Sequence, residues 1–146
     1  MLIDARLIDD EYSKPRWAVD IPMLDSVTQG YTKKEAVAMA IDLVECLLDA
    51  YFGDGAAKQA KVSASKLKKD TFYIEAENEN MLISLILIRQ REKHGVTFKE
   101  LTERLKGKST FAYKRYESGK VNISVTQFYK LMRAVAPEKD VAISLV

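Results

Sequence analysis

The stretch that decides the fold runs from residue 97 to residue 120: Thr-Phe-Lys-Glu-Leu-Thr-Glu-Arg-Leu-Lys-Gly-Lys-Ser-Thr-Phe-Ala-Tyr-Lys-Arg-Tyr-Glu-Ser-Gly-Lys. Thr97 and Glu100 form a capping box, in which each side chain satisfies a backbone N–H that the first helical turn leaves free. Apolar residues then recur at helical spacing, at Phe98, Leu101 and Leu105. The pattern predicts a short helix that ends before Gly107.

A second short helix is predicted from Ser109 to about Glu117, because Ser118 and Gly119 follow it. Two short helices joined by a glycine-containing turn are typical of the helix-turn-helix, whose second helix enters the major groove of DNA. An inward face is expected for Ala112, Tyr113 and Tyr116. The residues predicted to contact DNA are Lys108, Ser109, Thr110, Phe111, Lys114, Arg115 and Lys120.

Each of these residue types suits a particular contact with DNA. Lys108 and Lys120 bracket the second helix and are expected to bind phosphates. Lys114 or Arg115 suits a guanine edge, and Phe111 suits a thymine methyl group. The alternative is an interaction module of packed helices with a solvated basic face.

Two further helices are predicted around this pair. One covers residues 80–94 and ends at Gly95, with His94 in its last turn as a capping residue. The other begins at the capping box Ser124 and Gln127 and ends before Pro137. The apolar tail, residues 141–146, is interpreted as a strand at a dimer interface.

The first half of the chain has a different periodicity. Apolar residues alternate with polar ones along residues 2–21, which predicts two strands of a hairpin, and residues 26–29 supply a short third strand. Thr32 and Glu35 form a capping box that opens a helix extending to about Tyr51, with Cys46 expected beside the core. Residues 53–69 are interpreted as a connection, and residues 71–76 as a last strand.

These patterns predict an α+β fold with two domains. Residues 1–77 are expected to form a small antiparallel sheet with one helix packed on it, and residues 78–146 an all-α helix-turn-helix domain. Residues 1–60 carry 6 Lys and Arg against 11 Asp and Glu, whereas residues 61–146 carry 17 against 10. A basic half suits a polyanion and an acidic half suits a basic partner.

Composition restricts the class of protein further. Apolar residues make up 47% of the chain, which indicates a folded core, and the single cysteine excludes a disulfide framework. The first residues do not predict a signal peptide, and no apolar run reaches the roughly 20 residues that span a bilayer. A cytoplasmic protein without a membrane role is expected.

The helix-turn-helix prediction is supported by a resemblance. Residues 97–105, Gly107-Lys108-Ser109 and residues 112–120, with the pattern Tyr-x-Arg-Tyr-Glu-x-Gly, resemble the Xre/Cro-type helix-turn-helix family. The chain differs from that family in one extra residue around Lys106 and Gly107, and in Phe98, where a phosphate-binding Gln is common. The resemblance implies sequence-specific binding of duplex DNA.

The first half also resembles a known family. Residues 16–22 (Arg-Trp-Ala-Val-Asp-Ile-Pro), residues 27–30 (Val-Thr-Gln-Gly) and Thr32 with Glu35-Ala36 are similar to the HicB-type antitoxins. That resemblance implies a truncated ribonuclease-H-like domain that neutralises a small basic HicA-type toxin, an mRNA-cleaving ribonuclease, while the second domain represses the operon of the pair.

The carboxylates expected to contact the toxin are Asp9, Asp10, Glu11, Asp20 and Asp25. They would replace the phosphates that a basic RNA-binding face normally holds. The alternative for residues 9–11 is a solvated hairpin tip.

Two other functions are considered. A ribonuclease-H-like nuclease would need carboxylates such as Asp4, Asp20 and Glu45 around Mg²⁺, but nothing in the sequence assembles them, so an enzyme, a metal site and a cofactor are not expected. A free-standing Xre-type repressor with a ligand-sensing first domain is the alternative regulator. A homodimer or higher even oligomer is expected, because two-fold symmetry doubles a short DNA site.

Overall fold

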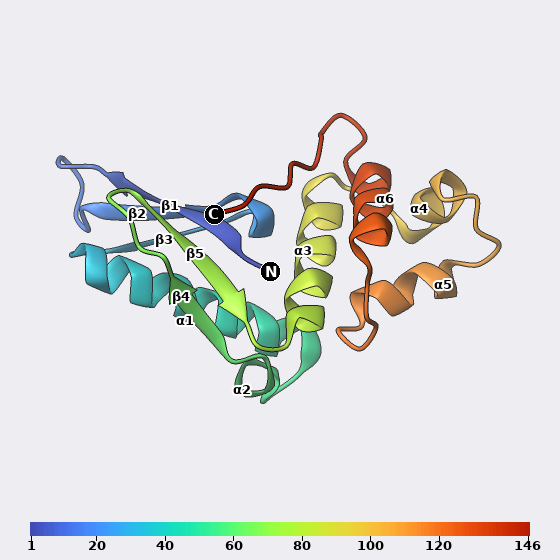
Figure 1. Ribbon diagram of the computed structural model, residues 1–146, viewed down its shortest axis with the longest axis horizontal. Coiled ribbons are helices and arrows are strands. Elements are labelled where there is room, and N and C mark those ends of the chain that lie inside the picture. Colours follow the sequence, from blue (N-terminus) through green and yellow to red (C-terminus); the bar gives the residue numbers. More distant parts are fainter.

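The computed structural model describes all 146 residues and combines a five-stranded antiparallel sheet with six α-helices. The sheet order is β3-β2-β1-β5-β4, and Figure 1 shows the sheet at one end of the molecule and the short helices α4, α5 and α6 at the other. The strands are β1 (Ile3–Asp9), β2 (Trp17–Ile21), β3 (Ser26–Gly30), β4 (Val62–Ser65) and β5 (Thr71–Ala76). This arrangement is consistent with the predicted α+β class.

The predicted alternation of the strands is confirmed, and it gives the sheet one buried face. Every second side chain of β1, at Ile3, Ala5 and Leu7, is buried. The neighbouring strands follow the same rule, with Val19 opposite Leu7 and Phe72 opposite Ala5, both fully buried. The other face carries residues such as Arg6 and Asp20, which are cross-strand partners.

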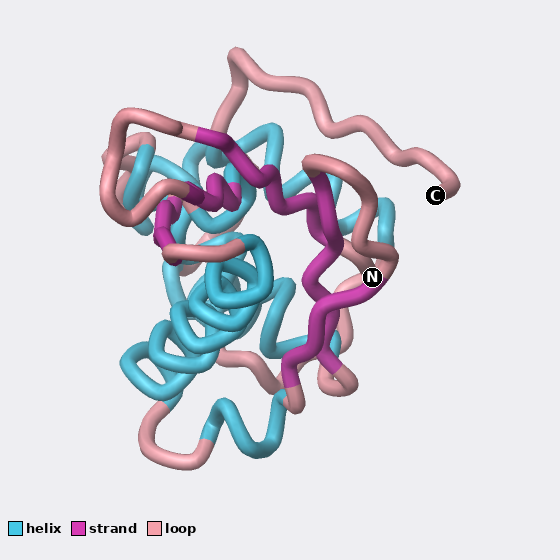
Figure 2. Tube along the Cα trace, turned by 90° about the vertical axis from the view of Figure 1, so that its left-hand side faces the viewer, coloured by secondary structure: helices cyan, strands magenta, loops and turns pink.

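The buried face is covered by α1 (Lys33–Phe52), and Figure 2 shows the strands curving around one side of this long helix. The helix begins as predicted: the Thr32 hydroxyl accepts a hydrogen bond from Glu35 N at 3.1 Å, and Tyr31 N donates to the Glu35 carboxylate at 3.1 Å. At the junction a Cβ on Gly30 would lie 2.4 Å from Ala36 N, so the strand and the helix approach more closely than any side chain permits. The prediction for Cys46 is wrong, because it is exposed.

The segment between α1 and β5 contains two elements that the sequence analysis missed. They are α2 (Ala56–Ala60) and the edge strand β4, so the interpretation of residues 53–69 as a plain connection is wrong. Helix α2 is fixed by its buried alanines and by the Asp49 carboxylate, which accepts from Ala57 N at 2.8 Å. Both elements are shorter than the window in which periodicity can be detected.

Helix α3 (Glu79–Lys93) lies between the sheet and the remaining helices. Eight consecutive residues, 81–88, are buried, because α1, α2 and β5 pack on one side of α3 and α6 with its neighbours on another. The core is therefore one continuous cluster of 29 buried residues that includes both halves of the chain. The predicted boundary at residues 77 and 78 falls in the turn between β5 and α3.

Polar contacts also join α3 to the sheet end, through the 3₁₀-helix η1 (Pro22–Leu24). Arg89 Nε donates to the Leu24 carbonyl at 2.9 Å, and Gln90 Nε2 donates to the Met23 carbonyl at 2.9 Å. Side chains from α3 thus satisfy carbonyls that a three-residue helix leaves free. None of the helices has both the length and the apolar character that crossing a bilayer requires.

Candidate nucleic-acid interface

The predicted helix pair is formed by α4 (Phe98–Arg104) and by α5 (Thr110–Lys114), which continues into the 3₁₀-helix η2 (Arg115–Glu117). Helix α6 (Val125–Val135) follows and packs on α3 and α4. One half of each predicted capping box is confirmed: the hydroxyls of Thr97 and Ser124 accept from the third residue of their helices at 3.1 and 3.2 Å. The return bond is not formed, and the Gln127 side chain donates to the Tyr116 hydroxyl instead. The cap of α5 is Ser109, whose hydroxyl accepts from Phe111 N at 3.2 Å.

The turn between α4 and α5 is closed by two backbone bonds. Lys106 N donates to the Glu103 carbonyl at 3.1 Å, and Gly107 N donates to the Thr102 carbonyl at 2.8 Å. Lys106 itself has a φ of 55°, in the left-handed region where glycine usually ends a helix. The turn therefore exposes the Lys106 side chain next to the start of α5, a cation that the sequence analysis did not select.

Most of the predicted DNA-contacting residues are exposed. Phe111 has 72% of its surface accessible, and the side chains of Lys108, Lys114, Arg115 and Lys120 also face solvent. Two predictions need revision in detail: the Ser109 hydroxyl is engaged as a helix cap, and Thr110 is half-buried.

The inward face of α5 and η2 differs from the prediction at one position. Tyr113 is buried and Tyr116 is half-buried, as expected, but Ala112 is exposed. The prediction for Ala112 is wrong: it lies about 100° around the helix from Tyr113, and no other element covers that side of α5.

A buried ion pair holds α5 and η2 against α3. Arg91 donates two hydrogen bonds to the Glu117 carboxylate, from Nε at 2.7 Å and from a terminal nitrogen at 3.1 Å, and both side chains are largely hidden from solvent. The Tyr113 hydroxyl donates to the same carboxylate at 2.8 Å. Burial, followed by the Glu117 charge, raises the pKa of Tyr113 above its ordinary value. Three polar groups on three elements thus satisfy one another.

A second anchor joins η2 to α3 through the fully buried Ser84. Its hydroxyl donates to the Tyr116 carbonyl at 2.7 Å and accepts from Gly119 N at 3.0 Å. The one polar residue inside the apolar run 81–88 therefore binds the backbone on both sides of the end of η2. This position is fixed by α3, so the exposed residues of α5 and η2 are carried on a rigid support.

Phe98 occupies the position where the resemblance leads one to expect a phosphate-binding amide. Its ring lies 5.8 Å from that of Tyr113, with the Arg91 guanidinium 4.3 Å from its centre and the Lys114 ammonium 5.1 Å from it. Phe98 therefore serves packing and cation–π contact, and it orients Lys114.

The charge of this region is strongly positive. Residues 98–135 contain nine Lys and Arg and three Glu. Arg115, Lys108 and Lys120 form no ion pair or side-chain hydrogen bond with the chain, so these cations are available to an external anion. Glu117, the acidic residue nearest to Arg115 in sequence, is occupied by Arg91.

The carboxylates predicted to contact a toxin do not form a single free cluster. Asp9 is held by Arg16, with hydrogen bonds of 2.6 and 2.8 Å that lower the pKa of Asp9. Asp10 accepts from Ser13 Oγ and closes the hairpin, and Asp25 lies 3.0 Å from Lys93 Nζ. Only Glu11 and Asp20 make no ion pair or hydrogen bond through their carboxylates; Glu11 lies at the hairpin tip, and Asp20 on the sheet face opposite α1.

A comparison with protein-family models and a comparison with curated proteins each find no match to this chain. No group of three or more His, Cys, Asp or Glu side chains comes together as a metal site, so Asp4, Asp20 and Glu45 do not form the cluster that a two-metal nuclease requires.

Proposed function

We propose that the C-terminal helices bind duplex DNA and that the protein is a transcriptional regulator with an Xre-type helix-turn-helix. The observation that carries this proposal is the set of unpaired cations on η2 and on either side of α5 and η2, Arg115, Lys108 and Lys120. They lie next to a support fixed by Arg91, Glu117 and Ser84. A rigid helix can present side chains to base edges reproducibly, while free cations replace the counterions of the phosphate backbone.

The expected roles follow from exposure and chemistry. Arg115 presents a free guanidinium that suits the two acceptors of a guanine, and exposed Phe111 suits a thymine methyl group. Lys108 and Lys120 lie on either side of α5 and η2 and would grip phosphates, with Lys106 as an additional contact from the turn. Lys114 lies against Phe98, where it would bind the DNA backbone more readily than a base.

The first half of the protein is proposed to be a truncated ribonuclease-H-like domain that acts as a HicB-type antitoxin. Its free carboxylates, Glu11 and Asp20, can pair directly with the basic side chains of a small HicA-type ribonuclease. Asp9 and Asp25 can take part only by exchanging Arg16 and Lys93 for cations of the toxin. Occupation of the RNA-binding face would neutralise the toxin without any catalysis by the antitoxin.

Both roles together give autoregulation. A cytoplasmic homodimer would bind a two-fold operator of its own operon through two copies of α5, while each first domain binds one toxin. A free-standing repressor would share the DNA-binding half of this account and lack the toxin.

The DNA-binding half is tested by measuring the affinity of the purified protein for a duplex taken from immediately upstream of its gene. Arg115→Ala should weaken binding by about 1–3 kcal/mol, since it removes one guanine contact. Lys14→Ala in the hairpin between β1 and β2 is the matched control, because it removes an exposed cation at the sheet end of the molecule and should bind like the unmodified protein. Equal affinities of the Arg115 and Lys14 variants would remove Arg115 from the site.

The antitoxin half is tested by co-purification with the product of the neighbouring small gene. Glu11→Gln combined with Asp20→Asn should release that product, whereas Glu103→Gln on α4 should retain it. Retention by both variants would refute the proposed surface. If no protein co-purifies and the chain still binds DNA, the protein functions as a free-standing repressor.

A further inference from the structure

The tail, residues 141–146 (Val-Ala-Ile-Ser-Leu-Val), is an extended segment whose backbone is unpaired. It forms no strand, which corrects the expected secondary structure, and none of its N–H or C=O groups bonds to another backbone group. Its one hydrogen bond joins Lys66 Nζ to the Val146 carbonyl at 2.7 Å. Free backbone groups along an extended segment are a template for pairing with another strand.

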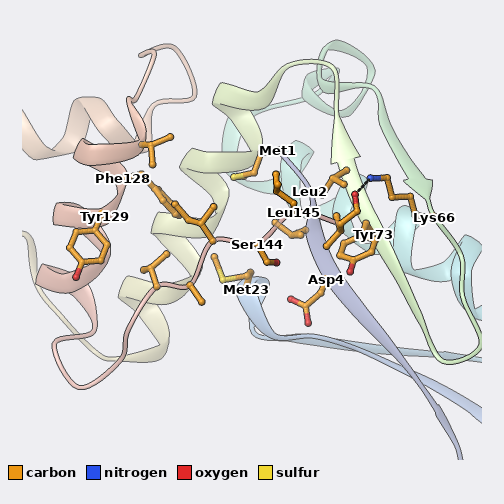
Figure 3. Close-up of a pocket in the computed structure, with 16 residues that line it drawn as sticks. Met1, Leu2, Asp4, Met23, Lys66, Tyr73, Phe128, Tyr129, Ser144 and Leu145 are labelled. Carbon is orange, nitrogen blue, oxygen red and sulfur yellow. Dashed lines mark hydrogen bonds between the residues drawn. The ribbon is translucent and has the colours of Figure 1, made fainter.

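The tail is mostly apolar, and its side chains from Ala142 onward face solvent. Ile143 has 77% of its surface exposed, and Leu145 is fully exposed. The tail forms one wall of an open hollow of about 710 Å³, whose other wall is formed by α6, the start of the chain and the sheet end, and 13 of the 16 lining residues are hydrophobic. Figure 3 shows the tail extending from α6, which carries Phe128 and Tyr129, past Met23 to Leu2 and Tyr73 near Lys66. Projecting apolar groups and an apolar hollow therefore occur on the same surface, here called the tail patch.

The accessible surface area of the chain can be compared with that of a compact monomer of the same mass. The accessible surface is 8851 Å², whereas a compact monomer of this mass exposes about 7,600 Å². The excess of about 1,300 Å² exceeds the area of roughly 800 Å² that one partner buries in a stable complex. The tail patch contributes to this excess, because Ile143 and Leu145 are almost fully exposed.

We propose that the tail patch is the surface through which two copies of this chain associate. The two tails pair in antiparallel fashion about a two-fold axis, and Ile143 and Leu145 of each copy pack against α6 and into the hollow of the other. In a two-fold dimer the same patch of each copy contacts the other copy. The projecting side chains and the hollow that receives them must therefore lie on one face of the chain. The segment has no charged side chain, so its pairing with itself brings no like side-chain charges together.

This inference rests on the homodimer of the proposed function and assigns its surface. No residue of the tail patch belongs to α5 or η2. Association through the tail would therefore leave the cations of both copies free for DNA.

The oligomeric state in the absence of DNA tests the proposal. Light scattering of the full chain at micromolar concentration should give the mass of two chains. Ile143→Lys combined with Leu145→Lys should raise the dissociation constant at least about tenfold, since it places charges in an apolar contact. Val27→Lys is the matched control, because Val27 is 67% exposed on another surface and its variant should remain dimeric. A monomeric unmodified chain, or a dimer that survives the double substitution, would overturn the proposal.

The pairing of the tails has its own readout. In a Cys46→Ser background, single cysteines at Ala142, Ile143 and Ser144 should include one that gives a covalent dimer under mild oxidation, because antiparallel pairing about a two-fold axis brings one position opposite its own copy. Ser63→Cys on β4 should stay monomeric on a denaturing gel. Absence of a covalent dimer from all three tail positions would overturn the pairing. These measurements contain no DNA, so a dimer that fails to bind DNA would refute the proposed function alone.

Discussion

Tyr113 shows how a single side chain links the stability of this protein to the anchor of α5 and η2. Its ring packs on Phe98, and its hydroxyl donates to a carboxylate that also holds Arg91. Ionising this phenol would place a second negative charge beside Glu117 in a buried site, so burial and that charge keep its pKa above the ordinary range.

This raised pKa predicts a loss of stability in alkali. A phenol whose pKa is raised by folding contributes stability below the pKa of the unfolded chain, about 10, and the contribution is lost as the pH rises above that value. Tyr113→Phe should lower the stability at neutral pH by about 1–3 kcal/mol, through loss of a hydrogen bond to a charged group. Urea unfolding of both proteins at neutral pH and at about pH 11 checks this. The difference between them should shrink at the higher pH, and a constant difference would contradict the account.

At the residue scale the sequence predicted local features well. The caps at Thr32, Thr97 and Ser124 depend on residues three positions apart, so the motif alone determines them. The ion pair between Arg91 and Glu117 was not predictable, because the partners are 26 residues apart and meet only when α3 and η2 pack. Nor did the sequence show that Asp9 would be bound by Arg16 across the hairpin.

At the scale of elements, α3 determines where the candidate interface lies. The apolar run at residues 81–88 of α3 does not reveal which neighbouring elements will bury it. Its pattern also did not distinguish a helix from a strand at the start of α3. Ser84 is the exception within that run, since its hydroxyl satisfies two backbone groups at the end of η2.

Ser84→Ala should therefore destabilise the protein by about 2–3 kcal/mol, because it leaves a buried N–H and a buried carbonyl unsatisfied. It should also weaken DNA binding, since η2 loses part of its support. Ser63→Ala, an exposed serine on β4, should leave both unchanged. Thermal unfolding and the duplex affinity measured on the same samples make the comparison. Equal stability of the two variants would show that the Ser84 bonds carry no net free energy.

Helix α2 and strand β4 were not predicted from the sequence for the same reason. Helix α2 spans five residues and β4 four, and alanine, serine and lysine in these segments give no apolar period. Long α1 and the alternating strands were predicted because a buried face repeated over several turns or pairs leaves a clear pattern. Short elements such as α2 are determined by contacts with α1 and α3, which lie outside the local sequence.

At the scale of the whole molecule, the continuous core predicts cooperative unfolding. Helix α3 is buried by the sheet end on one side and by α6 and η2 on the other, so neither half retains its core without it. Calorimetry should give one transition, with the calorimetric enthalpy equal to the van't Hoff enthalpy of a two-state unfolding coupled to dissociation of the proposed dimer. Two separated transitions would mean that the halves fold independently in spite of their shared helix.

The central claim is that the free cations on and around α5 lie against the phosphates of duplex DNA. The most direct measurement is the salt dependence of the affinity for the upstream duplex, compared between the unmodified protein and the variant Lys108→Ala with Lys120→Ala. Each lost phosphate contact in a bound copy should reduce the slope of log affinity against log salt by about 0.9, so the double variant should show a slope shallower by about 2 per copy. An affinity without salt dependence, or the same slope in both proteins, would contradict the claim.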